Sequence, residues 1–372
     1  MKNRWVRQLF AGFVLAAVLM GGCQKTTEKE NTTEISDETD RESAKETADA
    51  AVQTDDTDPA VRDVFAMDTY MTLTAYGDGK EEAVDAAEAE ITRLDTMLST
   101  GNPDSEIAKV NAAGNGLLSE DAAYLVERSL ELYESTGGKF DIAIYPVMKA
   151  WGFADQNFRV PDAEELQTLL ENTDASKISL NEATDELQLP EGMEIDLGGI
   201  AKGYTSSRIM EIYKSLGITS GLVNLGGNVQ ALGSKPDGSL WRVAVQSPNS
   251  EEDYLGVLSI SDRAVITSGG YERYFEQDGI TYHHIIDPST GYPANNGLTS
   301  VTIVSEDGIL ADGLSTSMFI LGREQAADYW QQHKDEFDMI LLDDNNALWV
   351  TEGIADSFEP LGDRTAEVIH VD

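Results

Sequence analysis

The sequence predicts an α+β fold, with a mixed and mainly antiparallel sheet and flanking helices. Short β-branched and aromatic segments recur in clusters, and few helical segments separate them. A doubly wound parallel sheet would need a helix after nearly every strand. We find no internal repeat. Without its polar N-terminal part the chain keeps a little over 300 of its 372 residues, enough for one large domain or two intimately packed ones.

The N-terminus has the pattern of an export signal. Lys2, Arg4 and Arg7 precede an apolar run over residues 9–20, which is too short to span a bilayer as a mature helix. Small residues then lead into Cys23, the only cysteine, and this end resembles the lipobox of bacterial lipoproteins. By that resemblance Cys23 becomes a diacylated, palmitate-bearing N-terminus in an extracytoplasmic membrane protein. The alternative is a plain secretory signal whose cysteine happens to lie near its end.

Residues 24–59 are rich in Thr, Glu, Asp, Ser and Ala and have almost no large apolar side chain. Such a composition cannot offset its ordering entropy, so we expect a disordered acidic tether. A lipidated Cys23 leaves no cysteine for disulfides. The expected organisation is therefore a signal peptide over residues 1–22, an anchor and tether over 23–60, and a folded domain over 61–372.

The formal net charge of −41 makes nucleic acid an unlikely partner, because a polyanion is repelled. A phosphate-bearing ligand would need a bound cation, a helix N-terminus or a specific lysine.

The elements follow in chain order. Residues 61–76 have strand composition and end in a Gly-Asp-Gly turn, and residues 80–98 have apolar side chains at helical spacing. Helices are expected at 122–135, closed by Gly137 and Gly138, at 163–170, at 201–216 and at 311–321. Strands are expected at 177–180, 186–189, 194–197, 221–225, 241–246, 257–260 and 264–267.

Residues 196–204 run from an expected strand through Gly198 and Gly199 into a helix. Glycines there let backbone approach a ligand, and a helix N-terminus attracts phosphate. Lys202 in the first turn opposes the helix dipole, so stability does not explain it. Tight packing alone is the alternative reading, and the segment lacks the G-x-G-x-x-G fingerprint of dinucleotide-binding folds.

Residues 310–317 open another helix, in which Asp312 and Thr316 are spaced i, i+4 and share one face. A carboxylate and a hydroxyl, completed by carbonyls and waters, suit Mg²⁺ or Ca²⁺. The alternative is that Asp312 is an N-cap and Thr316 an ordinary helix residue.

Residues 281–293 predict a strand that enters a turn, with His283 and His284 beside it. On strand alternation one imidazole points inward and the other outward. A histidine there is structural or, beside a phosphate site, a general base.

Nine short motifs in sequence order resemble the FAD:protein FMN transferases, the ApbE-type flavin transferases. They lie at residues 67–69, 104–111, 138–146, 151–153, 196–204, 224–228, 267–271, 284–291 and 311–316. The resemblance implies a single α+β domain that moves the FMN half of FAD onto a Ser or Thr hydroxyl of an acceptor protein, such as a membrane redox subunit, and releases AMP. Two other outcomes stay open, FAD pyrophosphatase activity and flavin binding without catalysis.

The resemblance also implies site residues. FAD would contact Met67, Lys139, Phe140, Asp141, Asp196, Lys202 and Ile286. A divalent metal, Mg²⁺ with Ca²⁺ or Mn²⁺ as alternatives, would be held by the Gly199 carbonyl, Asp312 and Thr316, with Ser315 as a further contact. We expect His284 to be the general base, ahead of His283. The chain departs from many relatives at Gly101, where they carry an aromatic residue thought to stack on the flavin or adenine ring.

Overall fold

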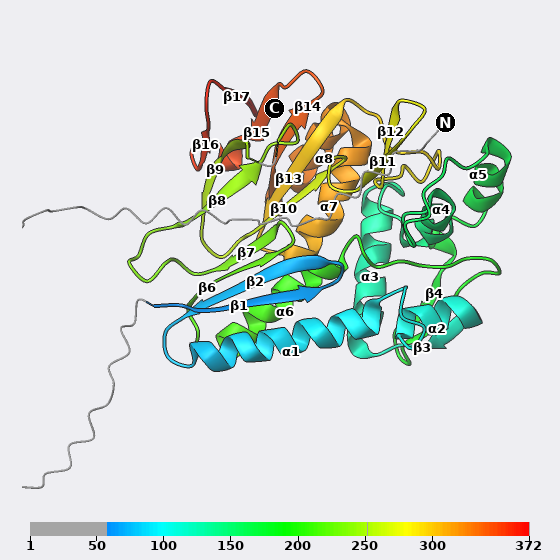
Figure 1. The fold of residues 1–372 in the computed structure, drawn as a ribbon, viewed down its shortest axis with the longest axis horizontal. Helices are drawn as coiled ribbons and strands as arrows, with labels where there is room; N and C mark the ends of the chain where they lie inside the picture. Colours follow the sequence, from blue (N-terminus) through cyan, green and yellow to red (C-terminus); the bar gives the residue numbers. More distant parts are fainter. Residues whose placement is uncertain (1–57, 251, 372) are drawn as a thin grey trace, which may run out of the picture.

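The computed structural model describes residues 58–250 and 252–371. The expected signal peptide, Cys23 and nearly all of the expected tether lie outside the described residues. Figure 1 shows a layered molecule in which one large twisted sheet carries helices on one face and a smaller sheet on part of the other. None of the described helices combines the length and the apolar character needed to cross a membrane.

The central sheet has nine strands in the order β1-β2-β6-β7-β10-β13-β14-β15-β17. All its pairs are antiparallel except β15 with β17. The strands are β1 (Ala60–Ala66), β2 (Thr69–Tyr76), β6 (Ser220–Leu225), β7 (Asn228–Leu232), β10 (Ala264–Gly269), β13 (Leu298–Ser305), β14 (Phe337–Asp343), β15 (Leu348–Thr351) and β17 (Ala366–Ile369). The predicted α+β class with a mainly antiparallel sheet is confirmed.

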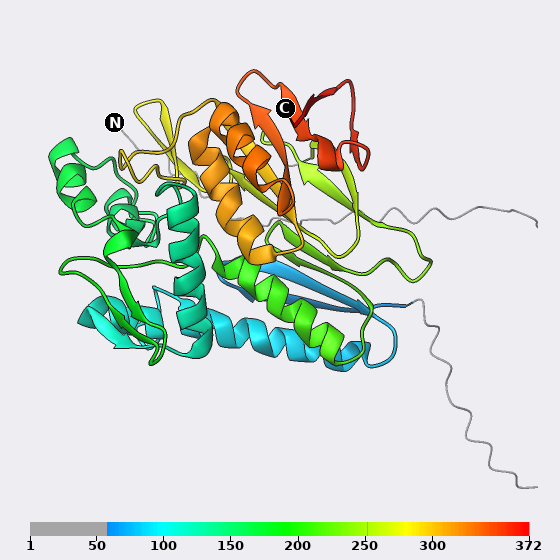
Figure 2. The ribbon, with the colours of Figure 1, turned by 180° about the vertical axis from the view of Figure 1, so that it is seen from behind.

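Helices cover the back face of this sheet (Figure 2). They are α1 (Lys80–Leu98), α6 (Ala201–Ser215), α7 (Gly308–Leu321) and α8 (Arg323–His333), with α3 (Glu120–Ser135) packed beside them. One apolar cluster joins α1 and α6 to β1, β2 and β6. A larger one joins α3, α7 and α8 to β10, β13 and β14. Burial of these helix faces fixes the relative positions of α6 and α7.

The front face is covered over only part of its width. A three-stranded sheet of β16 (Phe358–Pro360), β9 (Tyr254–Ile260) and β8 (Trp241–Gln246) packs on the β7 to β15 region through a third apolar cluster. On the outer side of β1 and β2 the side chains of Val61, Phe65 and Tyr70 stay exposed.

Smaller elements surround the end of the sheet next to α3. They are α2 (Glu106–Ala113), the sheet of β3 (Asn115–Leu117), β5 (Glu186–Gln188) and β4 (Ser179–Asn181), the helices α4 (Tyr145–Trp151) and α5 (Ala163–Leu170), the hairpin β11 (Tyr274–Gln277) and β12 (Ile280–His283), and the short 3-10 turns η1 (Ile142–Ile144), η2 (Ala175–Lys177) and η3 (Glu352–Ile354). Aromatic side chains of α4 and β11–β12 pack on one another, with the ring centroids of Trp151 in α4 and Tyr282 in β12 5.2 Å apart. This packing ties β11–β12 to α4.

The helix predictions at 80–98, 163–170, 201–216 and 311–321 are confirmed within a few residues, and the helix expected at 122–135 is α3. The segments α2, α4 and α8 were not predicted, because α2 and α8 bury only two residues each and α4 is only seven residues long. In α8, for instance, only Ala326 and Trp330 are buried.

Two strand predictions were wrong. Residues 61–76 form a hairpin rather than one strand: Ala66 pairs with Thr69, and Met67 and Asp68 form the turn with φ of 48° and 59°. Residues 194–197 are not a strand. Backbone groups of Ile195 bond the Asn111 side chain, and the Asp196 N–H donates to the Ile142 carbonyl, so side-chain and loop partners replace a neighbouring strand.

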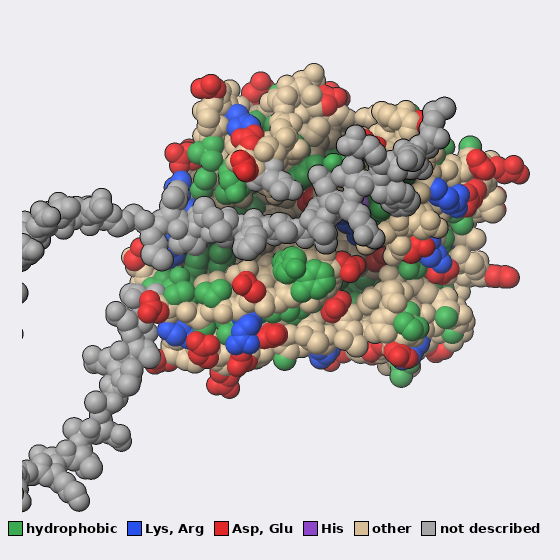
Figure 3. Space-filling model, viewed as in Figure 1, with side chains coloured by type: hydrophobic (Ala, Val, Ile, Leu, Met, Phe, Trp, Pro, Cys, Tyr) green, Lys and Arg blue, Asp and Glu red, His purple; other side chains and the backbone are tan. Residues whose placement is uncertain are grey.

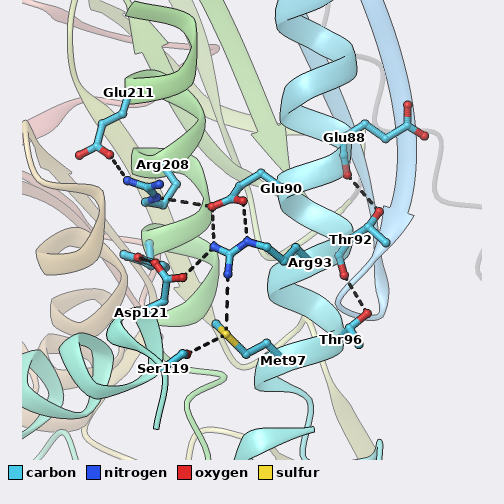
Figure 4. A network of polar contacts seen from close by, with 11 residues as sticks. Glu88, Glu90, Thr92, Arg93, Thr96, Met97, Ser119, Asp121, Arg208 and Glu211 are labelled. Carbon is cyan, nitrogen blue, oxygen red and sulfur yellow. Dashed lines mark hydrogen bonds and ion pairs between the residues drawn. The ribbon is translucent and has the colours of Figure 1, made fainter. Parts of the chain in front are cut away.

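Charged side chains tie α1, α3 and α6 together behind the sheet (Figure 4). Arg93 of α1 lies 2.8 Å from Glu90 and 2.7 Å from Asp121 of α3, and Arg208 of α6 lies 3.5 Å from Glu90. We call Glu90, Arg93, Asp121 and Arg208 the helix ion network. It holds in place the helix whose N-terminus enters the candidate site.

Candidate functional site

The site is built where the N-terminus of α6 crosses α7. A Cβ on Gly203 would lie 2.2 Å from the Gly308 carbonyl oxygen and 2.7 Å from the Asp312 Cβ. Any larger residue at 203 would therefore push the two helices apart. Glycine in the first turn of α6 brings the free N–H groups of that turn against the second turn of α7.

Asp312 lies at this crossing and is only 6% exposed. Its Oδ2 accepts a hydrogen bond from the Gly203 N–H at 2.7 Å, and its Oδ1 accepts from Asn228 Nδ2 at 3.0 Å. Burial raises the pKa of Asp312, while the Lys202 charge and the two N–H donors work against that rise. No Lys or Arg within the described ranges forms an ion pair with it. Asp312 is thus a buried carboxylate that accepts hydrogen bonds from two neutral donors.

Asp312 is not the N-cap of its own helix. Asp307 fills that position and accepts from the N–H groups of Ile309 and Leu310. Instead, Asp312 caps α6 from outside, because α6 has no side-chain cap of its own. This removes the simple N-cap reading of the sequence and leaves two roles for Asp312, capping α6 and ligating a cation.

Three hydroxyls lie close together one helical turn beyond Asp312. Ser315 Oγ donates to the Asp312 carbonyl at 2.8 Å and lies 2.7 Å from Ser268 Oγ of β10, which is 3.4 Å from Thr316 Oγ1. Ser315 is fully buried, whereas Thr316 is partly exposed. Asp312, Ser315 and Thr316 therefore do come together, on one side of α7.

These residues fit a hard divalent cation. Within the described residues no group of three or more His, Cys, Asp or Glu side chains could hold a metal, so such a site would rest on one carboxylate with hydroxyl, carbonyl and water oxygens. Each carboxylate oxygen of Asp312 has a further lone pair beyond the bond it accepts. Mg²⁺ is commonly bound through one or two carboxylates, with waters and substrate phosphates as its other ligands.

The segments expected to contact FAD are joined by polar contacts. Lys139 lies 3.2 Å from Asp287 Oδ1, and Trp151 Nε1 donates to the Gly291 carbonyl at 2.7 Å. Ile286 is buried beside these contacts and bridges to Pro293. The structure therefore places the motifs at 138–146, 151–153 and 284–291 in one corner of the fold.

The tip of the β1–β2 hairpin lies on α6. Thr205 Oγ1 is 3.9 Å from the sulfur of Met67, one turn of helix beyond Lys202. Two consecutive non-glycine residues with positive φ are uncommon, and such strain often accompanies function. Met67 is thereby held against the first turns of the helix that carries Lys202.

Phe140 and Asp141 are buried rather than open to a ligand. The Phe140 ring would lie 3.1 Å from a Cβ on Gly199, so it packs against that glycine. Asp141 accepts from the N–H groups of Ala143 and Ala175. Burial, opposed by those two bonds, raises the pKa of Asp141 to about 6. Asp196 accepts from the Gly198 N–H at 2.6 Å and so shapes the glycine turn.

The two histidines have different surroundings. His283 Nε2 donates to the Ala294 carbonyl, and its Nδ1 accepts from the Ile285 N–H, so both ring nitrogens are occupied. His284 Nδ1 lies 3.2 Å from the Arg273 carbonyl oxygen. A carbonyl only accepts, so Nδ1 carries the proton and Nε2 has the lone pair. Burial, helped by the Arg273 charge, lowers the pKa of His284 to about 3, which keeps the imidazole neutral.

Three residues beside the site had no role predicted from sequence. Asn228 and Ser268 lie within motifs that the sequence singled out, yet only their contacts reveal them as partners of Asp312 and Ser315. Glu272 also lies here, since Lys202 and Asp312 both act on its charge. Burial raises the pKa of Glu272 to about 7. The only feature of the sequence that could have pointed to Glu272 is its position directly after the motif at 267–271.

A hollow of about 760 Å³ elsewhere on the surface is lined by residues of α3, α6 and the β4–β5 hairpin, with Ile309 of α7, and several of these residues are acidic. None of the predicted site residues lines it. We therefore assign the candidate site to the α6–α7 crossing and not to this hollow.

The profile of the ApbE family matches residues 67–341. The chain belongs to the ApbE family. The match begins at the Met67 turn and ends within β14, so it spans every element that builds the site.

Named relatives agree with this membership. A FAD:protein FMN transferase of Klebsiella pneumoniae (strain 342) is 34% identical over 276 residues, covering 73% of this chain and 85% of that protein. One of Treponema pallidum (strain Nichols) is 33% identical over 318 residues, covering 80% and 88%. The crystal structure of the ApbE protein of Thermotoga maritima has a TM-score of 0.77 at 30% identity, covering 81% of this chain and 99% of that chain. The flavinyl transferase ApbE of Pseudomonas stutzeri, in its apo form, has a TM-score of 0.73 at 28% identity, covering 81% and 97%.

Proposed function

We propose that this chain transfers the FMN moiety of FAD to a Ser or Thr hydroxyl of an acceptor protein. The observation that carries the proposal is the α6–α7 crossing, where the buried Asp312 carboxylate has no ion pair among the described residues. The Lys202 charge acts on it, and Ser315 and Thr316 follow it on the same face of α7. The two relatives described above are both FAD:protein FMN transferases.

In the proposed reaction the acceptor hydroxyl attacks the phosphorus of the FMN half of FAD. The bond between that phosphorus and the bridging oxygen breaks, AMP leaves, and FMN stays on the acceptor as a phosphoester. His284 takes the hydroxyl proton at Nε2, which its neutral tautomer leaves available. Lys202 and Lys139 supply positive charge near the pyrophosphate, in a protein whose net charge of −41 would otherwise repel it.

A divalent ion belongs to this proposal. Asp312, Thr316, Ser315 and the Gly199 carbonyl would hold it, with Mg²⁺ as the first expectation and Ca²⁺ or Mn²⁺ as alternatives. When bound, it would neutralise charge on the phosphoryl oxygens. Met67, Phe140, Asp141, Asp196 and Ile286 would position the flavin and adenine ends, Phe140 and Asp141 through the backbone that they hold.

The purified chain, FAD, Mg²⁺ and a peptide with a single threonine test the function. Mass spectrometry should find the peptide heavier by FMN less one water, and AMP should appear in equal amount. Release of AMP with free FMN and no adduct would make the chain a FAD pyrophosphatase. FAD binding without AMP release would make it a flavin carrier.

We also propose that the chain is lipid-anchored at Cys23 on the extracytoplasmic side of a bacterial membrane, on the sequence pattern described above. Cell fractionation should recover the protein with membranes, and the Cys23→Ser variant should not yield the mature lipidated protein. Soluble, fully processed wild-type protein would contradict the anchor.

A further inference from the structure

The outer side of the β1–β2 hairpin carries apolar side chains that strand alternation turns away from the core. Val61, Phe65 and Tyr70 are 55%, 63% and 61% exposed, while Val64 and Met71 point inward and are buried. Figure 3 shows hydrophobic side chains gathered over these strands on the front face. Large apolar side chains that are exposed and lie next to one another are typical of protein interaction sites.

Phe65 and Tyr70 form a defined pair within this surface. They face each other across the hairpin, with ring centroids 5.0 Å apart in an edge-to-face arrangement. The short Met67–Asp68 turn and the strand register fix both rings in the free protein. A fixed aromatic pair loses little entropy on binding, and aromatic residues dominate the energetics of protein interfaces.

The pair lies at the site end of the hairpin. Only Ala66 lies between Phe65 and Met67, whose sulfur lies 3.9 Å from Thr205 Oγ1 of α6, one turn beyond Lys202. The smaller sheet covers the neighbouring β7 to β15 part of this face (Figure 1). A macromolecular substrate whose hydroxyl reaches the site would contact the protein surface around the site, which includes this end of the hairpin.

The charge around the aromatic pair limits which partner can bind this surface. Asp63 and Asp68 are exposed around the aromatic pair, and the whole chain carries a net charge of −41. An anionic lipid surface or a second copy of this chain would be repelled, whereas an apolar segment without net negative charge would not.

We propose that the outer face of the β1–β2 hairpin, centred on Phe65 and Tyr70, docks the acceptor protein through an apolar segment next to the hydroxyl that receives FMN. The inference rests on the proposed transferase function. It adds that the enzyme selects acceptors by apolar side chains near the modified residue.

The test uses two synthetic peptides of 15 residues, each with one threonine and no net charge. One has Leu and Val beside the threonine, and the other has Ser and Gly. The wild-type chain should have a KM for the apolar peptide lower by about tenfold or more, the range that burial of an aromatic pair supports. In the variant with Phe65→Ser and Tyr70→Ser this preference should disappear, while FAD hydrolysis without peptide stays at the wild-type rate.

Leu117→Ser is the matched control, because Leu117 is 74% exposed on β3, outside this surface. It should keep the peptide preference. Equal KM values for both peptides in the wild type, or a preference that survives the double substitution, would overturn the docking surface while transfer itself stands. Loss of self-association or of binding to phosphatidylglycerol vesicles in the double variant, with the peptide preference unchanged, would assign the face to another copy or to lipid. A wild type that modifies no acceptor would remove the transferase function and the docking surface together.

Discussion

The carboxylates of the helix ion network and the carboxylate at the α6–α7 crossing have opposite pKa shifts, although both regions involve α6. In the network, hydrogen bonds from Arg93 lower the pKa of Glu90. Burial acts to raise the pKa of Asp121, but hydrogen bonds from Tyr204 and Arg93 outweigh it, and the pKa is lowered. At the crossing, burial prevails and raises the pKa of Asp312.

The difference supports the proposal that Asp312 binds a ligand, whereas the network charges hold the fold. A carboxylate paired with arginine has its partner inside the chain and needs nothing more. A buried carboxylate without a cation costs free energy, and that cost falls when a cation binds. Perturbed carboxylates near a site are for this reason typical of functional positions. The two regions should therefore respond differently to substitution, in activity at the crossing and in stability at the network.

The largest effect is expected at Asp312. Asp312→Ala removes the only carboxylate of the proposed metal site, so FMN transfer should fall by about a thousandfold or more. Rates of AMP release at saturating Mg²⁺ and FAD measure this. The control is Asp307→Ala on the same helix, which removes the α7 cap and should cost about 1 kcal/mol of stability with activity kept. Full activity of Asp312→Ala in EDTA would contradict the metal site.

His284→Ala should lower the transfer rate by about a hundredfold to ten-thousandfold, the usual contribution of a general base. FAD affinity, measured separately by fluorescence, should stay within a few-fold of wild type. His283→Ala is the comparison, because both of its ring nitrogens bond within the protein. That variant should lose stability more than rate, and the reverse ranking would exchange the two roles.

Glu272→Gln should change how stability depends on pH. The pKa of Glu272 is raised from 4.5 to about 7 by burial, so the folded state holds a proton that the unfolded state has lost. This group's contribution to stability is therefore greatest below pH 4.5 and is lost as pH rises to about 7. Without metal or FAD, the variant should gain stability relative to wild type at pH 8 but not at pH 4. Denaturant unfolding of both proteins at the two pH values measures this. An equal difference in the free energy of unfolding at pH 4 and pH 8 would contradict the raised pKa of Glu272.

The smallest effect on activity is expected in the network. Arg93→Ala leaves Glu90 and Asp121 with weaker partners, so the free energy of unfolding should fall by about 1–2 kcal/mol while transfer stays near wild type. Arg242→Ala is the control, because Arg242 and Glu359 form an ion pair on the surface, 52% and 66% exposed. It should cost less than about 0.5 kcal/mol. A large activity loss in Arg93→Ala would show that the network acts on the site.

Local patterns predicted the long helices and the strand-rich class, because α1 and α3 bury regular apolar faces. Local patterns failed where contacts between distant residues determine the backbone conformation. Residues 61–76 read as one strand because neither Met67 nor Asp68 is a glycine, although both adopt positive φ. Residues 194–197 read as a strand because Ile195 and Leu197 are apolar, although Asn111 takes up the backbone groups of Ile195.

The sequence by itself determined the fold class, the family resemblance and the short list of chemical groups, since these depend on residue type and spacing. Only the tertiary structure decided how those groups are used. It set Asp312 across the N-terminus of α6 rather than at the start of α7, because Gly203 lets the helices approach. It also distinguished His284 from His283 by their hydrogen-bond partners. Such roles depend on contacts between residues far apart in the chain, which no local pattern encodes.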